Sequence, residues 1–461
     1  MTSLYAHHAL LPQGWTSNVR LHWDENGDLS QIELDAALQA HEHEYEQQAQ
    51  WVLPGMSNLH SHAFQRAMAG MTEMASEGKY NGKDSFWTWR DLMYRYALHI
   101  TPEQIQAIAA QLYAECLRHG YTSVCEFHYL HRNQDGDFYA RPAEMAERVI
   151  AAAAQTGMGI SMLPVLYSYA DFGELALRHD QRRFSSNVAE IMQLIEALEG
   201  KRSAQVEVGV APHSLRAASI SQIRELVAAL PAERPIHIHI AEQQKEVDAC
   251  IAYAGKRPVE LLLDSGLVDQ RWCLVHATHL NKVEVQGIAA SGAVAGICTT
   301  TEGNLGDGFF DLPDYIAAGG RFGIGSDSHV SQSPVEELRW LEYGQRLRLQ
   351  GRNIASLPAQ RKVGDFLYQA ALQGGAQASG RKLGQLTVGY RADMVVLDED
   401  HPNLAGIHSA DVLNTWIFAG NDNLVRDVYV GGRQVVANGR HGQQTEIQAA
   451  YKNCMEKLRS L

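Results

Sequence analysis

The chain has 461 residues, 45% of them hydrophobic and 20% charged, so it can bury a large core and form one big domain with a smaller one. Its formal net charge of −14 argues against nucleic acid or an anionic membrane as a partner, since either would need clustered Lys and Arg side chains. Residues 1–20 lack a basic start followed by an apolar core, and the six cysteines lack Cys-x-x-Cys spacing, so we expect a cytoplasmic protein with reduced thiols.

A turn signal near the start of the chain predicts a β-hairpin. Asp24-Glu-Asn-Gly27 separates the strand-like stretches Arg20–Trp23 and Leu29–Leu34. We assign residues 1–52 to the first part of a small β domain.

Eight short strand-like stretches occupy the middle of the chain, and most are followed by a helical pattern. Alternating strands and helices imply right-handed parallel crossovers, and eight of them imply a closed (β/α)8 barrel of the TIM type, which we assign to residues 53–382. The stretches are Val52–His60, Thr122–Tyr129, Gly159–Tyr167, Gln205–His213, Pro235–Glu242, Trp272–His279, Ala293–Thr300 and Arg321–His329.

Two of the intervening helices carry start signals. Thr101-Pro-Glu-Gln104 predicts an N-cap with proline in the first turn of a helix that Gly120 ends. Ser333-Pro-Val-Glu336 predicts a capping box.

Strand and turn signals return from about Leu383, as in Met394-Val-Val-Leu-Asp398 and Val428-Tyr-Val-Gly-Gly-Arg433. Two β segments that flank a barrel would pair with each other. We therefore predict a β-sandwich domain built from residues 1–52 and 383–461, with a terminal helix in its second part.

The most informative motif is His60-Ser-His62, which follows an apolar run and a Pro-Gly turn. In an extended segment the i, i+2 spacing puts both imidazoles on one side of the backbone, where they can bind one metal ion.

Other candidate groups lie near the ends of later strands, which meet at the catalytic face of such a barrel. The fifth strand offers His239, with His237 interpreted as a buried, hydrogen-bonded histidine, and the eighth offers Asp327. His60, His62, His239 and Asp327 together form a three-histidine, one-carboxylate set suited to one Zn²⁺ or a similar ion that activates water. Fe²⁺ and Mn²⁺ suit the same ligands.

The chain resembles the amidohydrolase superfamily, in its mononuclear deaminase-like branch. The motifs behind the resemblance are Pro54-Gly-Met-Ser-Asn-Leu-His60-Ser-His62, His239-Ile-Ala-Glu242, Val275-His276, Gly325-Ser-Asp327-Ser and Gly389-Tyr-Arg-Ala-Asp393-Met-Val-Val-Leu. The fourth strand lacks the lysine that binuclear members carbamylate, which favours one metal.

Within that branch, four stretches are similar to formimidoylglutamate deiminases, which hydrolyse N-formimino-L-glutamate to N-formyl-L-glutamate and ammonia in histidine degradation. They are His62-Ala-Phe-Gln-Arg-Ala-Met-Ala-Gly70, Phe86-Trp-Thr-Trp-Arg90, Pro212-His-Ser-Leu-Arg216 and Ser328–Arg339. Such a dicarboxylate needs guanidinium groups, and Arg216 and Arg90, on loops after the fourth and first strands, fit that need. Arg90 is alternatively a stacking partner of Trp87 or Trp89.

The resemblance implies the remaining roles. Gln65, Tyr129 and His213 complete the pocket, metal-bound hydroxide attacks the formimino carbon, and Glu242 protonates the departing nitrogen. His276 and Asp327 handle the protons of the water, with the base unassigned and His276 alternatively an orienting residue. Family members tend to be dimers, so we expect a homodimer, with Trp340 or Tyr343 at an interface or in the core.

Two other functions stay open at this point. The same metal set serves deaminases of purines, nucleosides or triazines, although paired arginines favour a dianionic substrate. The second alternative is a catalytically inactive barrel that acts as a scaffold.

Overall fold

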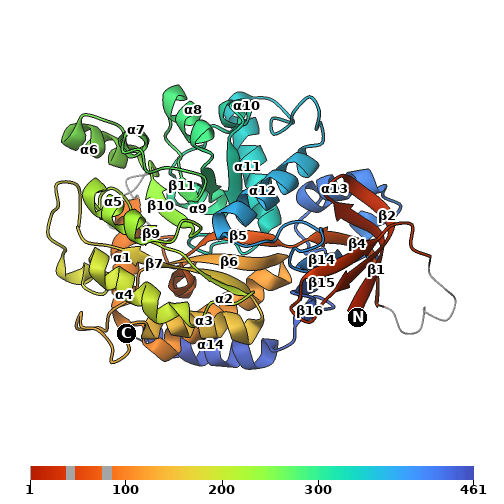
Figure 1. Cartoon of the computed structure of the whole chain (residues 1–461), viewed down its shortest axis with the longest axis horizontal. Helices are drawn as coiled ribbons and strands as arrows, with labels where there is room; N and C mark the ends of the chain where they lie inside the picture. Colours follow the sequence, from red (N-terminus) through yellow and green to blue (C-terminus); the bar gives the residue numbers. More distant parts are fainter. Residues whose placement is uncertain (1, 38–46, 75–85, 461) are drawn as a thin grey trace.

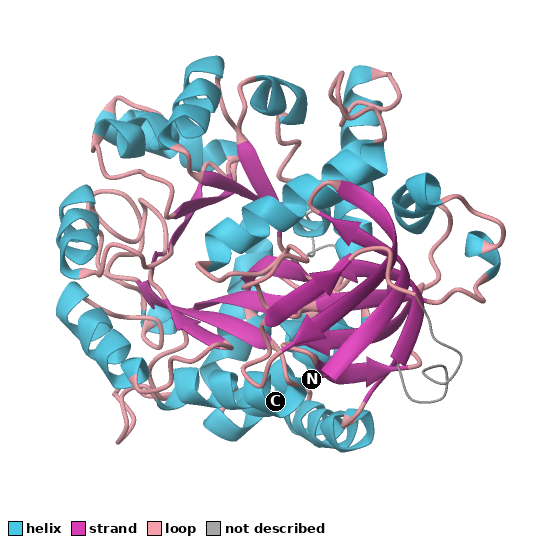
Figure 2. Cartoon of the chain, turned by 45° about the vertical axis from the view of Figure 1, so that its right-hand side comes forward, coloured by secondary structure: helices cyan, strands magenta, loops and turns pink. Residues whose placement is uncertain are grey.

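Strands from both terminal segments form one sheet beside a barrel of the central residues, as Figure 1 shows in a computed structural model that describes residues 2–37, 47–74 and 86–460. The barrel strands are parallel and alternate with helices that surround them (Figure 2). None of the helices among these residues is long and apolar enough to cross a membrane.

The barrel strands pair in chain order. One sheet runs β5-β6-β7-β8 with β9 on β7, and the other runs β10-β11-β12-β13. Single bridges from Val210 to Ile236 and from Ser61 to Asp327 join the two sheets into a ring, so the predicted barrel is confirmed. The strands are β5 (Met56–Ser61), β6 (Tyr121–His128), β7 (Gly159–Leu166), β8 (Val206–Val208), β9 (Ala211–Pro212), β10 (Ile236–Ile240), β11 (Trp272–His276), β12 (Val294–Ile297) and β13 (Arg321–Ile324).

Two predicted barrel strands are interrupted by glycine. The stretch predicted as Val52–His60 is the end of β4 (Gln47–Pro54) followed by β5, because the Gly55 amide donates to Asp393 and the next amide, of Met56, donates to Gly120. The fourth strand breaks between β8 and β9 at Gly209, where a Cβ would lie 2.5 Å from the carbonyl oxygen of Pro235.

The helices on the barrel follow the capping signals in part. Thr101 and Gln104 form the capping box of α2 (Pro102–Arg118), and Gly120 follows the helix end with φ of +100°. The box predicted for α11 (Pro334–Leu349) is wrong, because the Glu336 carboxylate accepts instead from the Ser331 hydroxyl at 2.5 Å.

The remaining helices follow in chain order. They are α1 (Phe86–His99), α3 (Glu144–Thr156), α4 (Val188–Glu199), α5 (Ile220–Ala229), α6 (Gln244–Ala254), α7 (Pro258–Asp264), α8 (Lys282–Ser291), α9 (Thr299–Leu305), α10 (Leu312–Ala317), α12 (Val363–Ser379), α13 (Val412–Phe418) and α14 (Gln444–Leu458).

The terminal strands form one continuous eight-stranded sheet. Its order is β17-β16-β15-β14-β4-β1-β2-β3, so β4 joins the two ends of the chain, and β2 and β3 form the predicted hairpin. The other strands are β1 (Thr2–Leu11), β2 (Gly14–Trp23), β3 (Leu29–Glu33), β14 (Met394–Leu397), β15 (Val425–Val430), β16 (Arg433–Ala437) and β17 (Arg440–His441).

Alternating residues of the central strands face two cores. Trp51 and Leu53 of β4 belong to the main core with the barrel, whereas Val52 belongs to a smaller core on the other face of the sheet. The predicted terminal helix, α14, packs against α2 of the barrel. The division into residues 1–52, 53–382 and 383–461 stays a prediction.

Candidate active site

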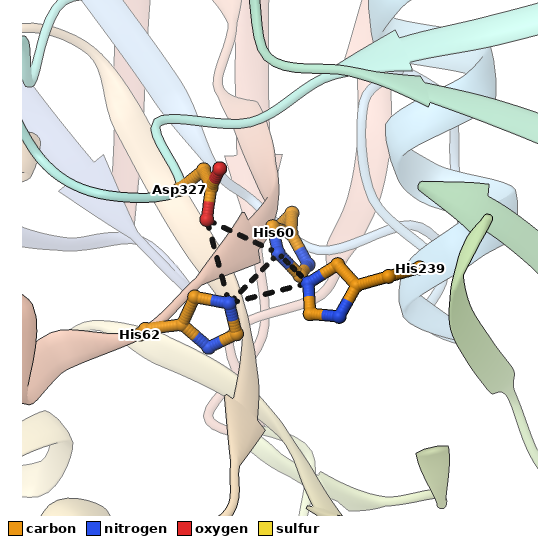
Figure 3. Close-up of side chains that lie close together, drawn as sticks. All are labelled: His60, His62, His239 and Asp327. Atoms are coloured by element: carbon orange, nitrogen blue, oxygen red, sulfur yellow. Dashed lines mark hydrogen bonds and ion pairs between the residues drawn. The ribbon is translucent and has the colours of Figure 1, made fainter. Parts of the chain in front are cut away.

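Three imidazoles and one carboxylate converge at one end of the barrel (Figure 3). His60 and His62 come from β5 and the residue after it, His239 from β10 and Asp327 from the turn after β13. All four are buried, and the Nε2 atoms lie 3.1 Å (His60 to His62), 3.3 Å (His62 to His239) and 2.9 Å (His239 to His60) apart. Asp327 Oδ1 is 3.4 Å from both His60 Nε2 and His62 Nε2.

These spacings fit a single metal ion. Ligands about 2.0–2.1 Å from a tetrahedral ion lie roughly 3.3 Å from one another, close to the spacings between these four atoms. His62 Nδ1 lies 2.9 Å from the Phe127 carbonyl, to which it donates, so its Nε2 lone pair faces the other ligand atoms. The donor set therefore suits a divalent cation of the zinc type.

Two groups able to transfer protons lie beside the tetrad. His276, at the end of β11, has Nε2 3.8 Å from Glu242 Oε1 and 3.8 Å from Asp327 Oδ2. Glu242 follows β10, and its amide donates to the Glu246 carboxylate at 3.1 Å, which fixes the backbone of this turn. On its far side, His276 Nδ1 lies 3.4 Å from Glu302 Oε1.

Burial and charge move the pKa values of these groups apart. Burial raises the pKa of Glu242 to about 7. Burial lowers the pKa of His276, but the carboxylates of Glu242, Glu302 and Asp327 outweigh it and raise that pKa to about 10. Burial raises the pKa of Asp327, but its hydrogen bond with His60 and the neighbouring imidazoles hold it below the usual range.

A cavity opens over the tetrad. Every sequence-predicted site residue except His60 lines it, which brings together Gln65, Arg90, Tyr129, His213 and Arg216 with the candidate metal and proton-transfer groups. A concave site with a few convergent polar groups is typical of small-molecule binding.

The cavity wall carries hydrogen-bonding groups. Gln65, on the 3-10 helix Ala63–Met68, donates through Nε2 to the Tyr129 hydroxyl at 2.8 Å, and its buried Oε1 has no hydrogen-bond partner among the described residues. His213 Nδ1 lies 3.1 Å from the Ser214 hydroxyl. Burial and then Arg216 lower the pKa of His213, which keeps this imidazole neutral.

The two arginines come from different elements. Arg216 follows β9 as predicted and is 6% exposed. Arg90 lies in α1, so its prediction on a loop is wrong, and its guanidinium carbon is 5.6 Å from the centre of the Tyr94 ring. The Trp87 side chain, named as a stacking alternative, lies outside the described residues.

Six cavity residues were not predicted as site residues, namely Trp89, Met93, Tyr94, Tyr167, Phe184 and Leu305. Tyr167 ends a predicted barrel strand, which is a positional signal that could have identified it. Phe184 and Leu305 have no such signal, because they come from a long loop and from the end of the short α9. His237 is the buried histidine that was expected, 2.7 Å through Nε2 from the Ala378 carbonyl.

Comparison with known proteins places this site in a family. Residues 51–435 match the amidohydrolase family, and residues 1–46 match the N-terminal domain of formimidoylglutamate deiminase HutF. The chain is 51% identical to a formimidoylglutamate deiminase of Pseudomonas aeruginosa, across 99% of this chain and 100% of that protein.

Solved structures show the same fold. An amidohydrolase from Brucella melitensis is 43% identical, with a TM-score of 0.93 and full coverage of both chains. An adenosine deaminase from Xanthomonas campestris with bound zinc is 20% identical, with a TM-score of 0.79 and coverage of 100% of this chain and 99% of that one. The chain belongs to the amidohydrolase family.

Proposed function

We propose that this protein hydrolyses N-formimino-L-glutamate to N-formyl-L-glutamate and ammonia. The observation that carries the proposal is that one cavity is lined by two guanidinium groups, Arg90 and Arg216, together with the metal tetrad and its proton-transfer groups. Two cations suit the two carboxylates of this substrate. The identity to the Pseudomonas aeruginosa formimidoylglutamate deiminase supports the same substrate.

His60, His62, His239 and Asp327 would hold one Zn²⁺, with Fe²⁺ and Mn²⁺ as chemically acceptable alternatives. When bound, such an ion supplies a Lewis acid that lowers the pKa of a coordinated water to about 7.

The proton-transfer groups would work on both sides of the formimino carbon. Burial keeps the pKa of Glu242 near neutrality, which suits a carboxyl group that gives its proton to the departing nitrogen. The Asp327 carboxylate would take up the proton that water loses. His276 faces it at 3.8 Å and, kept protonated by the carboxylates around it, would stabilise the negative charge beside it. The carbon gains the water oxygen, its bond to the terminal nitrogen breaks, and ammonia leaves.

The remaining cavity residues would bind and orient the substrate. Arg216 and Arg90 would bind the carboxylates. The buried Gln65 Oε1 would accept a hydrogen bond from an N–H of the cationic formimino group. Tyr129 and His213 would complete the hydrogen bonds. An orientation set at several points brings the reacting carbon to the tetrad.

Steady-state kinetics with three substrates test the proposal. Zinc-loaded protein should turn over N-formimino-L-glutamate with a far higher kcat/KM than adenosine or atrazine, because neither ring compound offers the arginines a carboxylate. Preferred turnover of adenosine or atrazine would overturn the substrate assignment, and inactivity on all three would favour a non-catalytic scaffold.

We also propose a cytoplasmic homodimer. All six cysteines are buried and unpaired, which fits a reducing compartment. Trp340, Tyr343 and Leu347 lie on one face of α11 and are 48%, 37% and 73% exposed, which makes this helix a candidate contact surface. Light scattering should give twice the chain mass, and Leu347→Glu should give the single-chain mass.

A further inference from the structure

A line of buried polar side chains lies behind the metal tetrad, and the proposed mechanism uses none of them. Its members are at most 2% exposed, come from β5, β6 and the turn after β13, and are Asn58, Ser61, Glu126, Ser326 and His329. We call these five residues the buried chain.

Hydrogen bonds connect the buried chain from end to end. Asn58 donates from Nδ2 to Ser326 Oγ at 2.6 Å, and the Ser326 hydroxyl lies 3.0 Å from His329 Nδ1. His329 Nε2 lies 3.3 Å from Ser61 Oγ, and the Ser61 hydroxyl donates to Glu126 Oε2 at 2.6 Å.

Glu126 sets the direction of these bonds. Its Oε1 accepts from the Ala63 amide at 2.6 Å, and its Oε2 accepts from both Ser61 and the Tyr113 hydroxyl, the latter at 3.0 Å. Burial raises the pKa of Glu126 to about 7, so above that pH Glu126 is a carboxylate that only accepts, and the single proton of Ser61 is committed to it. Ser61 Oγ must then accept from His329 Nε2–H, and His329 Nδ1 must accept from Ser326.

The buried chain alternates with the proposed metal ligands along the sequence. Ser61 separates His60 from His62, and Ser326 directly precedes Asp327. The same two segments are joined by backbone bonds, since the Asp327 amide donates to the His60 carbonyl at 3.0 Å and the His62 amide donates to the Asp327 carbonyl at 3.3 Å.

The turn after β13 needs such support. Asp327 and His329 have φ values of +47° and +63°, in the left-handed region that residues with a side chain rarely adopt. A strained backbone of this kind persists only where surrounding contacts determine it. The side chain of His329 is anchored on both ring nitrogens by Ser326 and Ser61.

We infer that Glu126 is a positioning residue for the metal centre: through Ser61 and His329 it holds the ligand segments of β5 and of the turn after β13 at their mutual spacing. The inference rests on the proposed metal centre. Glu126 does not line the cavity, and its hydrogen bonds go to Ser61, Ala63 and Tyr113, so it acts on the tetrad through these partners.

The Glu126→Gln substitution tests this with little change in volume. The backbone N–H of Ala63 cannot turn away, so the carbonyl of the new side chain should face Ala63 and its NH2 should face the Ser61 and Tyr113 hydroxyls, whose protons can rotate. The Ser61 proton then turns toward His329. We expect the Kd for zinc, measured by competition with a chromogenic chelator, to rise, by less than the roughly 10- to 100-fold that follows the loss of a group bonded directly to a metal ligand, because Glu126 acts one hydrogen bond further away.

Two controls separate positioning from general stability. Tyr113→Phe removes a donor to the same Glu126 oxygen but leaves the bond to Ser61, so its zinc Kd should stay near the parent value. Nitrogen-15 NMR of labelled histidines should find His329 as the Nε2–H tautomer in the parent and as the Nδ1–H tautomer in Glu126→Gln. A merely structural role would not move this tautomer.

The outcomes are distinct. Parent-like zinc affinity in folded Glu126→Gln, or an equal loss in Tyr113→Phe, would overturn the inference while leaving the proposed function intact. A parent protein that binds none of Zn²⁺, Fe²⁺ and Mn²⁺ would overturn both. If Glu126→Gln does not fold, Ser61→Ala serves in its place, because it removes the hydroxyl that joins Glu126 to His329, and unchanged zinc affinity would again refute the inference.

Discussion

Replacing Arg216 should expose which carboxylate of the substrate it binds. Arg216 is 6% exposed and lines the cavity together with Arg90. Removing one partner of a buried charge pair costs about 2–5 kcal/mol, which corresponds to a roughly 30- to 5,000-fold loss in binding. We therefore expect Arg216→Met to lower kcat/KM for N-formimino-L-glutamate within this range, mainly through KM.

The assay pairs the protein variant with altered substrates. Ammonia release is measured for N-formimino-L-glutamate and for its two monoamides, one at each carboxyl position, with parent protein and with Arg216→Met. In the parent both amides should be poor substrates. With Arg216→Met, one of the two monoamides should have nearly the same kcat/KM as N-formimino-L-glutamate. The carboxylate that is missing from this amide is the one whose guanidinium partner the substitution has already removed.

Additive effects would refute this reasoning. If both amides remain as disadvantaged in Arg216→Met as in the parent, Arg216 binds neither carboxylate. Arg90→Met is the matched comparison and should relieve the penalty of the other amide.

Three further predictions concern the proton-transfer group, the metal and pH. Glu242→Gln should lower kcat about 10²- to 10⁴-fold in ammonia-release assays, with zinc Kd near the parent value because Glu242 lies outside the tetrad; a loss below tenfold would contradict its role. Chelator treatment should lower the melting temperature, since zinc at about 100 times its Kd adds about 2.7 kcal/mol to the stability of the folded state, and an unchanged melting curve would argue against a site in these residues. Burial raises the pKa of Glu337 to about 8, so the folded protein keeps a proton that the unfolded chain loses near pH 4.5. The stabilisation from this retained proton is fully present below pH 4.5 and is lost as pH rises through about 8, by up to about 5 kcal/mol in the free energy of unfolding. Urea titrations of zinc-free protein should therefore find that the free energy of unfolding falls more steeply between pH 5 and 8 in the parent than in Glu337→Gln. Equal slopes would contradict this role of Glu337.

The barrel could be predicted because its strands and chemical groups follow a regular rule. Apolar stretches that end in polar residues identified all eight strand positions, and the same rule brought His239 and Asp327 to the histidines of β5. The ends of the strands were harder to predict, because the sequence is similarly apolar on both sides of Gly55 and Gly209, where the structure divides the predicted strands. The cost of a Cβ at those points depends on neighbours distant in sequence.

The parts that could not be predicted depend on tertiary contacts. Arg90 was placed on a loop although it lies in α1, because the aromatic residues before it obscure a helical pattern. Glu126 was missed, although a single carboxylate inside the buried strand Tyr121–His128 is a signal for a buried polar partner. That the partner is Ser61, 65 residues earlier in the chain, follows only from the folded structure.

Product analysis in ¹⁸O-labelled water tests the central claim most directly. Zinc-loaded protein is incubated with N-formimino-L-glutamate, and the products are identified by mass spectrometry alongside ammonia determination. The account predicts N-formyl-L-glutamate with one ¹⁸O in the formyl group and an equal amount of ammonia, since water attacks the formimino carbon and the terminal nitrogen leaves. Formation of glutamate and formamide, or no conversion by protein that has bound zinc, would contradict it.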